Sequence, residues 1–405
     1  MQRRHFLHAA GGALAAAAAP GWARPRMADN LPAGAPPPDL GHFARTVPLA
    51  PIRASADRII AINVCTRPFR AQGPRIEAEQ VGRRTVIHNY GHGGSGWSLS
   101  WGAAQDAVAL ARATGQSRIA VVGCGAIGLT TALVAQRAGL QVRIYAKELP
   151  PDVRSFYATG VWSPDSRICT AEHVTPEFER RWERQARTSF RTYQTLLGLP
   201  GEPIEWRDGY ALSDVPFDQP TGTGGESGEP HYPGLESRLL RDLGPRSRAL
   251  AAGQYPFPVQ YVRAYTQMTF NIAAYARLLI EDFRRAGGQV EIAEFAGLDE
   301  LARLPEKTVV NATGYGARAL LGDESVVPVC GQTARLVPQP EVDYGLSWRG
   351  HNLFVVPRRD GILVQAQAPG DFGNPDDRVD RAASEAAVAQ LATLFPAPVP
   401  SPAGA

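Results

Sequence analysis

The segment RIAVVGCGAIGLTTALVAQRAGLQVRIYAKE, at residues 118–148, constrains the fold of this chain more than any other. It reads as a short buried strand, a glycine turn, a helix ending at a glycine, and a second strand. This is the βαβ context that gives a GxGxxG match its meaning. Gly123, Gly125 and Gly128 permit a sharp turn, close approach of a pyrophosphate and tight helix packing. The segment therefore predicts an α/β domain that binds a dinucleotide at a helix N-terminus.

The end of the second strand supplies a candidate ribose ligand. Lys147 and Glu148 occupy that position, and only Glu148 can accept hydrogen bonds from ribose hydroxyls. This pattern leaves open whether the dinucleotide is NAD or FAD.

A second glycine cluster precedes the first, in HNYGHGGSGWSLSWG at residues 88–102. Its glycines let several backbone groups point the same way, and a helix is expected just beyond them. Such a helix terminus stabilises negative charge. Reduced flavin carries negative charge on its pyrimidine edge, whereas NAD has no comparable need, so the second cluster favours FAD. A plain NAD-dependent dehydrogenase would leave this cluster unexplained.

Composition limits the remaining classes. The chain has 405 residues, 44% hydrophobic, with a net charge of +3, which is typical of a globular protein of about two domains. Its basic residues are spread along the chain, so nucleic-acid binding has little support. The four cysteines lie far apart, without pairing or metal-ligand spacing, and we interpret them as small buried residues. No metal is expected.

The N-terminus reads as a targeting segment rather than as part of the fold. Arg3 and Arg4 precede a weakly apolar, alanine-rich run, which predicts a twin-arginine-type signal over residues 1–30 and export, to the periplasm. A linker follows at 31–47. The alternative is an alanine-rich disordered tail. The apolar run is too short for a membrane span, so we expect no stable membrane insertion.

Hydrophobic periodicity predicts further elements along the chain. Strands are expected at 57–64 and 83–91, helices at 101–115, 177–198 and 380–395, a helix followed by a strand at 271–294, a strand running into a glycine turn at 307–322, and strands over 352–367. The loop at 215–234 is long enough to be either a lid or an excursion without structure, and the sequence does not decide between them.

Several of these motifs together resemble the D-amino-acid oxidase family of FAD enzymes. The motifs are RPFR at 67–70, HNYGHGG, VVGCGAIGL, GVW at 160–162, VVNATG at 309–314 and VPVCGQ at 327–332. Pattern and resemblance predict an α/β fold, with a Rossmann-like FAD-binding domain and a second, α+β substrate domain built around a mostly antiparallel sheet. The expected FAD-binding domain is discontinuous, over 67–165 and 260–335. The expected substrate domain covers 48–66, 166–259 and 336–395, followed by a tail at 396–405.

The order of the motifs differs from that of the family. In the family the RPxR…HNYGHGG segment closes the chain, whereas here it precedes the dinucleotide motif. A circular permutation, in which residues 48–115 serve as the last segment of the fold, explains this order.

The resemblance assigns roles to particular residues. Arg67 matches the arginine that binds the substrate carboxylate, a task that suits a guanidinium fork. Gly94 matches the glycine whose carbonyl accepts a hydrogen bond from the substrate amine. The expected FAD ligands are Gly93, Ser95, Gly96, Trp97, Ser98, Leu99, Gly123, Gly125, Ala126, Ile127, Gly128, Glu148, Thr159, Gly160, Thr313 and Gly314.

The substrate side departs from the family pattern. Phe354 and Gly350 stand where the family has two tyrosines, so both phenol hydroxyls are missing, and Ala366 and Gln367 replace a pair of glycines. Tyr232, Tyr265 and Tyr344 are candidates for a replacement hydroxyl.

The sequence thus predicts an FAD-dependent oxidase that deaminates a D-amino acid or a related carboxylate-bearing amine. The products would be a 2-oxo acid, ammonia and hydrogen peroxide. In the family, catalysis relies on orientation without a dedicated protein base. Two alternatives are an FAD-dependent dehydrogenase that passes electrons to a quinone or carrier protein, and an FAD-binding protein without turnover. The expected partners are a small amine or amino acid and dioxygen or another electron acceptor.

Overall fold

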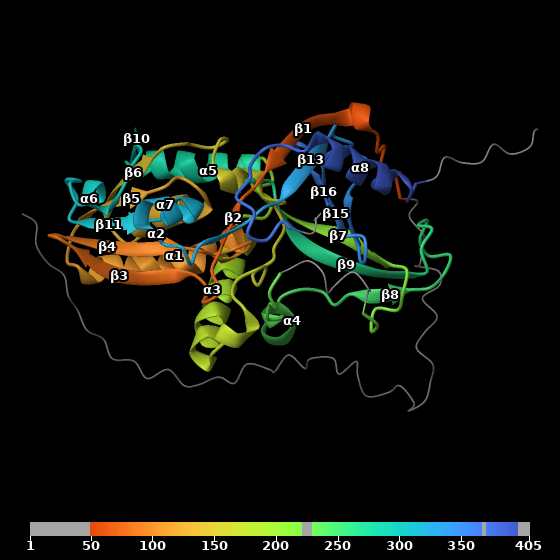
Figure 1. Ribbon diagram of the computed structural model, residues 1–405, viewed down its shortest axis with the longest axis horizontal. Coiled ribbons are helices and arrows are strands. Elements are labelled where there is room, and N and C mark those ends of the chain that lie inside the picture. Colours follow the sequence, from red (N-terminus) through yellow and green to blue (C-terminus); the bar gives the residue numbers. More distant parts are fainter. Residues whose placement is uncertain (1–48, 221–228, 367–369, 396–405) are drawn as a thin grey trace, which may run out of the picture. The chain divides into compact units, whose positions relative to one another are not determined.

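A computed structural model describes residues 49–220, 229–366 and 370–395 (Figure 1). The predicted signal segment, the linker at 31–47, part of the 215–234 loop, Gln367 and the tail lie outside the described residues. Export therefore remains a prediction from the sequence.

The predicted dinucleotide unit lies at the centre of a six-stranded sheet. The strand order is β10-β6-β5-β11-β4-β3, parallel except that β3 is antiparallel to β4. The strands are β3 (Arg75–Val81), β4 (Arg84–Tyr90), β5 (Arg118–Val122), β6 (Gln141–Ala146), β10 (Gln289–Ile292) and β11 (Thr308–Asn311). All four residues of β11 are buried, as expected for a central parallel strand. The predicted order β5, α2 (Ala126–Arg137), β6 is confirmed.

Helices pack beside this sheet in one connected group. α1 (Gly96–Ala113) packs against α2 and against α3 (Pro176–Gln194), and α2 also contacts α5 (Ile272–Arg285). α3 has a strong start signal, because the Thr175 side chain accepts a hydrogen bond from the Phe178 N–H and proline occupies the first helical position. α1 begins five residues earlier than the sequence predicts, within the second glycine cluster itself.

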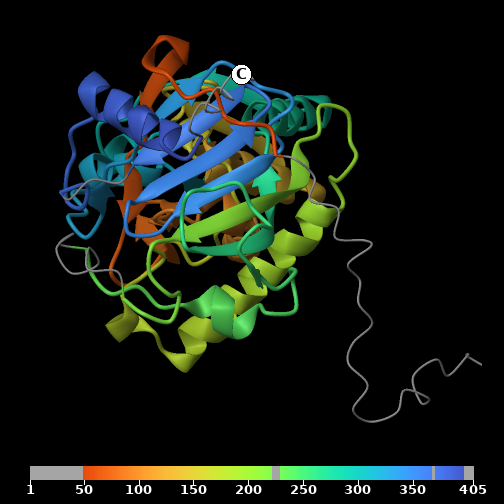
Figure 2. The same ribbon diagram turned by 90° about the vertical axis from the view of Figure 1, so that its right-hand side faces the viewer.

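A second, eight-stranded sheet lies to one side of the first (Figure 1). Its order is β1-β13-β16-β15-β14-β7-β9-β8, and every neighbouring pair is antiparallel except β7 and β14. The strands are β1 (Ile59–Val64), β7 (Ile204–Ser213), β8 (Arg248–Leu250), β9 (Tyr261–Phe270), β13 (Gln332–Leu336), β14 (Tyr344–Trp348), β15 (Leu353–Arg358) and β16 (Gly361–Ala366). α8 (Arg381–Ala392) packs on β16 and β13 (Figure 2). The mostly antiparallel second sheet agrees with the expected fold class.

Short elements complete the described chain. β2 (Arg67–Phe69) pairs with β12 (Val327–Val329) in a two-stranded ribbon. The others are η2 (Ala56–Arg58), η3 (Arg154–Tyr157), η4 (Ala171–His173), α4 (Leu235–Leu239), α6 (Leu298–Leu301), η5 (Gly314–Gly316) and α7 (Ala317–Leu321). The ribbon matters most for the site, because it carries Arg67.

The strand topology corrects one expected assignment. Residues 260–335 were expected in the FAD-binding domain, but β9 and β13 both belong to the eight-stranded sheet. β9 pairs with β7 along its whole length, from Tyr261 opposite Ser213 to Phe270 opposite Ile204. Pairing with a distant strand, which the local sequence does not encode, decides the sheet to which β9 belongs.

The segment with the displaced motifs is built into both sheets. β4 lies between β11 and β3, and β1 pairs with β13 at the edge of the other sheet. Leu49 and Ile52 share an apolar cluster with Phe395, near the last described residue. We propose a circular permutation as the origin of this arrangement, because the segment supplies strands to both large sheets although it comes first in the chain.

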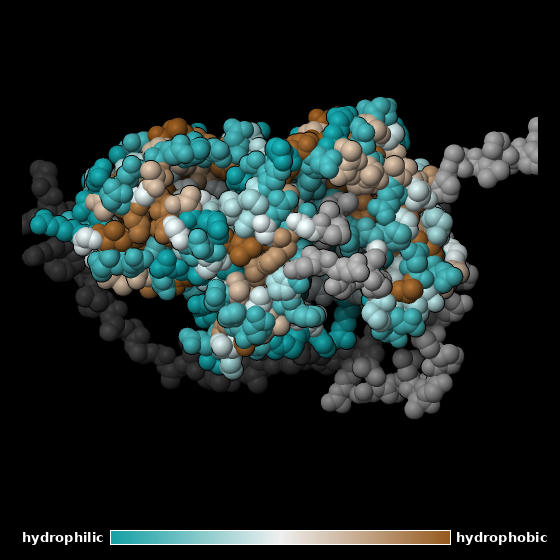
Figure 3. All heavy atoms as spheres, in the orientation of Figure 1, coloured by the Kyte–Doolittle hydropathy of each residue, from teal (hydrophilic) through white to brown (hydrophobic). Residues whose placement is uncertain are grey.

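On the face shown in Figure 3, hydrophobic residues lie in several separate small groups among hydrophilic ones. The large exposed hydrophobic residues of the described chain are Ile60, Leu197, Ile292 and Val379. Within the described ranges, no helix combines the length and apolar character that a membrane crossing requires.

Candidate active site

Both glycine clusters open onto one cavity of about 1110 Å³. Its walls come from residues 65–68, which lead into the ribbon strand β2, from the second glycine cluster, the β5–α2 turn, the segment after β6, and strands of the second sheet. Segments far apart in the sequence therefore enclose one space that is large enough for a dinucleotide and a small substrate.

The β5–α2 turn depends on its glycines in different ways. Gly123 has a φ of +110°, and an ideal Cβ there would lie 2.5 Å from the Ala312 carbonyl oxygen. A Cβ on Gly128 would lie 2.0 Å from the Gly123 carbonyl oxygen. Gly123, Gly125, Ala126 and Ile127 line the cavity, but Gly128 does not, so Gly128 contributes to packing rather than to ligand contact.

The second cluster forms a turn that ends in the N-terminus of α1. Gly93 has a φ of +54°, and its Cβ would lie 1.9 Å from the Arg167 carbonyl oxygen. A Cβ on Gly96 would meet no atom within 4 Å, although Gly96 lines the cavity. That open space lies beside free helix N–H groups, where a negatively charged ligand edge is stabilised.

The expected ligands in this turn fall into two groups. Gly93, Gly94, Gly96 and Trp97 line the cavity. Ser95, Ser98 and Leu99 are buried behind it: the Ser95 hydroxyl donates to the Ser166 carbonyl at 2.9 Å, the Ser98 hydroxyl accepts from the Ser163 N–H, and Leu99 packs in the core. The side chains of these three residues support the turn from behind.

The remaining expected ligands come from separate segments. Glu148, Thr159, Thr313 and Gly314 line the cavity. Gly160 does not; its φ is +82° and its carbonyl accepts a hydrogen bond from the Phe270 N–H at 2.8 Å. Glu148 lies beside Lys147, which pairs with Glu294 at 2.7 Å.

Arg67 and Gly94, the expected substrate ligands, both line this cavity. Arg67 Nη1 donates to the Cys330 carbonyl at 2.8 Å. A Cβ on Gly331 would lie 2.3 Å from the same nitrogen, so a glycine is needed there to let the guanidinium through. Burial lowers the pKa of Arg67 from its usual value. A partly desolvated guanidinium binds a carboxylate more strongly than one in water does.

The structure places the departures from the family pattern in the cavity wall. Phe354 and Gly350 line the cavity without offering a hydroxyl. None of the proposed replacements Tyr232, Tyr265 and Tyr344 lines it; Tyr344 instead donates to the Ala50 carbonyl in the second core. Ala366 ends β16, and Gln367 lies outside the described residues.

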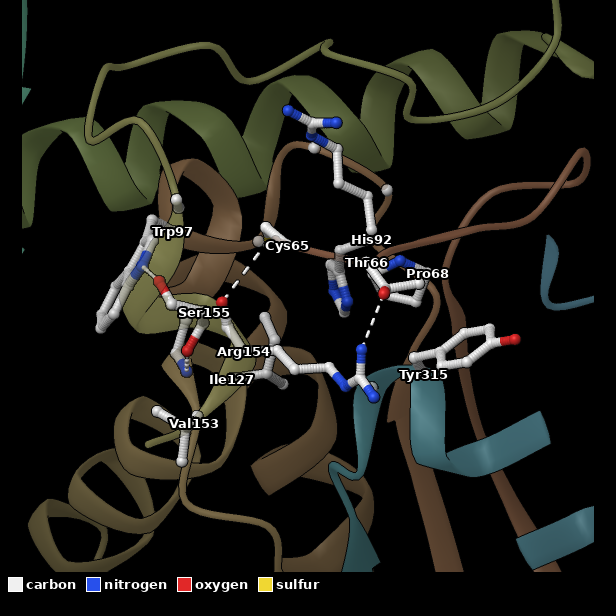
Figure 4. Close-up of a pocket in the computed structure, with 18 of the residues that line it drawn as sticks. Cys65, Thr66, Pro68, His92, Trp97, Ile127, Val153, Arg154, Ser155 and Tyr315 are labelled. Carbon is white, nitrogen blue, oxygen red and sulfur yellow. Dashed lines mark hydrogen bonds between the residues drawn. The ribbon is translucent and has the colours of Figure 1, made fainter. Parts of the chain in front are cut away.

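Sequence reasoning missed Arg154 and Ser155, in the η3 segment after β6. The Ser155 hydroxyl accepts from the Ala126 N–H at 3.0 Å, and its carbonyl accepts from Trp97 Nε1 at 2.8 Å. Arg154 donates to the Thr66 hydroxyl at 2.7 Å, with its guanidinium 5.6 Å from the centre of the Tyr315 ring (Figure 4). A motif search has no signal for them, since this loop has no periodicity.

Burial disfavours the protonated form of two histidines near the turn. His92 is 2% exposed, and burial lowers its pKa to about 3. His88 bonds to Glu79 at 2.9 Å, does not line the cavity, and has a lowered pKa, again because it is buried. Within the described ranges, no group of three His, Cys, Asp or Glu side chains is placed to hold a metal.

The donor set fits FAD. One helix N-terminus with a backbone-only glycine turn suits a pyrophosphate, and a second suits the pyrimidine edge of a flavin. Gly96 and Gly125 leave open the space that a cofactor would fill: a Cβ on Gly96 meets nothing, and one on Gly125 meets only Ser155. Glu148, the expected ribose ligand, lines the same cavity.

Comparisons with known proteins agree with this geometry. The profile of the FAD dependent oxidoreductase family, DAO, matches residues 118–403. The D-amino-acid oxidase of Rubrobacter xylanophilus is 29% identical over 289 residues, covering 69% of this chain and 78% of that protein. The D-amino-acid oxidase of Streptomyces coelicolor is 29% identical over 282 residues, with the same coverage.

Among solved structures, iminodiacetate oxidase from Chelativorans sp. BNC1 matches with 17% identity and a TM-score of 0.49, over 68% of this chain and 79% of that one. The family match covers more than half of the chain and includes the β5–α2 glycine turn that lines the cavity. The chain therefore belongs to the DAO family of FAD-dependent oxidoreductases and uses FAD as its cofactor.

Proposed function

We propose that this enzyme oxidises a D-amino acid, or a related amine that carries a carboxylate, to the 2-oxo acid. The observation that carries the proposal is that Arg67 and Gly94 lie in the wall of the cavity that the flavin-binding turn also lines. A guanidinium for the carboxylate and a carbonyl for the amine would fix both polar groups of the substrate. The D-amino-acid oxidases to which the chain is similar support the substrate class.

The reaction needs orientation more than acid–base chemistry. Bound FAD supplies the two-electron acceptor. Arg67 holds the carboxylate, the Gly94 carbonyl accepts from the amine, and the low pKa of His92 keeps that side chain neutral. The substrate would lose one hydrogen from Cα and one from its nitrogen, that is two electrons and two protons, to give an imine. Water would then hydrolyse the imine to the 2-oxo acid and ammonia, and the two electrons and two protons would pass finally to dioxygen, giving hydrogen peroxide.

The reaction class is tested without oxygen. Purified flavoprotein is mixed with panels of D- and L-amino acids while the visible flavin band is followed. Bleaching by particular D-amino acids, with peroxide formed once air is admitted, is the expected result. Bleaching without peroxide would indicate a quinone or carrier-protein acceptor, and no bleaching by any amine would contradict the proposal.

The role of Arg67 is tested by Arg67→Met. We expect FAD to stay bound while the half-saturating substrate concentration rises about a hundredfold, as for loss of a charge-assisted pair of hydrogen bonds. Arg207→Met is the control, because Arg207 also sits in a half-buried ion pair, with Glu205, but outside the cavity. Unchanged substrate affinity in Arg67→Met would show that the carboxylate assignment is wrong.

A further inference from the structure

A second arginine, Arg167, lies in the wall of the same cavity. Its neighbour Ser166 is bound to the flavin-binding turn, because the Ser166 carbonyl accepts from the Gly94 N–H and from the Ser95 hydroxyl, each at 2.9 Å. The Arg167 carbonyl itself fills the space where Gly93 would carry a Cβ. The backbone of Arg167 is therefore packed against the same turn that contains Gly94.

The backbone at Arg167 is held in an unfavourable conformation. Its φ is 51°, in the left-handed region that residues other than glycine seldom adopt. Such conformations persist where the surroundings enforce them, and they are concentrated at functional sites. Here the enforcing contact is the tight packing against Gly93.

The two guanidinium groups influence each other. After burial, the charge of Arg167 is a further cause of the lowered pKa of Arg67. Two like charges in one partly desolvated cavity repel, and an anion between them relieves the repulsion. The cavity therefore favours a ligand with negative charge at this end.

Arg167 also has an acidic neighbour that does not line the cavity. Its Nη2 lies 2.7 Å from Glu229 Oε1, and the two side chains are 12% and 17% exposed. The Tyr232 ring packs near the guanidinium, with 5.8 Å between the guanidinium carbon and the ring centre. Glu229 is thus placed to compete with a ligand for the same cation.

We propose that Arg167 binds the substrate carboxylate together with Arg67, in place of the phenol hydroxyls that Phe354 and Gly350 lack. In the absence of substrate, Glu229 forms an ion pair with Arg167, and the substrate carboxylate competes with Glu229 for this guanidinium. The inference rests on the proposed carboxylate-bearing substrate, and it adds a recognition residue that lies outside every motif of the sequence.

The test is carboxylate binding to the FAD-loaded protein, with benzoate and propionate as probes and the flavin absorption band as readout. We expect Arg167→Met to weaken binding about tenfold. Glu229→Gln should instead tighten it, because the competing charge is removed. Arg167→Lys, which keeps the charge but loses the fork, should fall between wild type and Arg167→Met. Arg207→Met is the matched control and should bind both probes like wild type.

Arg167→Met and Glu229→Gln are expected to change carboxylate affinity in opposite directions, and this difference distinguishes a binding role of Arg167 from a structural one. If the Arg167–Glu229 pair only holds the fold together, Glu229→Gln weakens binding as much as Arg167→Met does, and the inference is wrong. If Arg67→Met abolishes binding while both Arg167 variants bind like wild type, the inference is wrong but the proposed function stands. If neither probe binds the wild-type protein, or if Arg67→Met does not change probe binding, both the inference about Arg167 and the proposed carboxylate-bearing substrate are wrong.

Discussion

At the scale of single residues, Gly128 and Gly96 have no side chain for different reasons. Gly128 packs against the backbone of the chain, whereas Gly96 borders the space that the cofactor would fill. Gly128→Ala places a Cβ 2.0 Å from a backbone oxygen, so we expect the flavin-free protein to lose about 1–3 kcal/mol of unfolding free energy. Gly96→Ala points its Cβ into open cavity, so stability should change by less than about 0.5 kcal/mol while FAD affinity falls about tenfold. Thermal unfolding and a flavin fluorescence titration separate the two effects. Equal stability losses would contradict this interpretation.

His92 makes the stability of the protein depend on pH. In the unfolded chain a histidine binds a proton near pH 6.5, whereas in the folded protein the pKa of His92 is lowered to about 3, first by burial and then by Arg181. Between those values the unfolded state binds more protons, so stability falls as the pH drops. From pH 7 to pH 5 the loss should be about 2 kcal/mol.

This loss should be smaller in His92→Gln, which cannot gain a proton. The measurement is urea unfolding of both proteins at the two pH values with saturating FAD. Identical pH dependence in wild type and variant would show that His92 takes up a proton in the folded state.

At the scale of elements, Ser155 joins the N-termini of the two helices that face the cofactor. Its hydroxyl accepts from the first N–H of α2, and its carbonyl accepts from a side chain of the first turn of α1. Ser155→Ala should lower the unfolding free energy of the flavin-free protein by about 1 kcal/mol, as for a lost helix cap. Ser155→Thr keeps the hydroxyl and should restore most of it. Chemical denaturation of the three proteins checks this, and an unaffected Ser155→Ala would contradict it.

Elements with a complete local signal could be predicted from the sequence. The β5–α2–β6 unit combines a buried strand, a glycine turn and a helix within one short stretch. The sequence also predicted that the turns at Gly93 and Gly123 hold one ligand, and both turns line the same cavity. What could not be predicted depends on distant contacts. β9 belongs to its sheet through β7, and Arg167 meets Glu229 across 62 positions. No local pattern specifies either pairing.

At the scale of the whole molecule, we propose that the order of the motifs reflects a circular permutation of the chain. Residues 118–403 match the family profile, while β1, β3 and β4, which precede them, fill places in the two large sheets. η2 contacts α8, and Leu49 lies in the same apolar cluster as Phe395. A fold of this kind depends on which strands pair and not on where the chain begins, provided that the new connection is short.

A rearranged chain with the motif order of the family should therefore fold and bind FAD. In the rearranged chain, residues 116–395 come first, and a short glycine–serine linker joins Phe395 to Leu49, so that the chain ends at Gly115. The new break falls in the exposed turn between α1 and β5, where few contacts are lost. We expect a folded flavoprotein whose visible spectrum and FAD affinity match those of the original chain. A control opened between Val309 and Val310, inside the fully buried β11, should not fold. A soluble rearranged chain that binds no flavin would show that the cofactor site needs the present order, and the permutation would then not explain it.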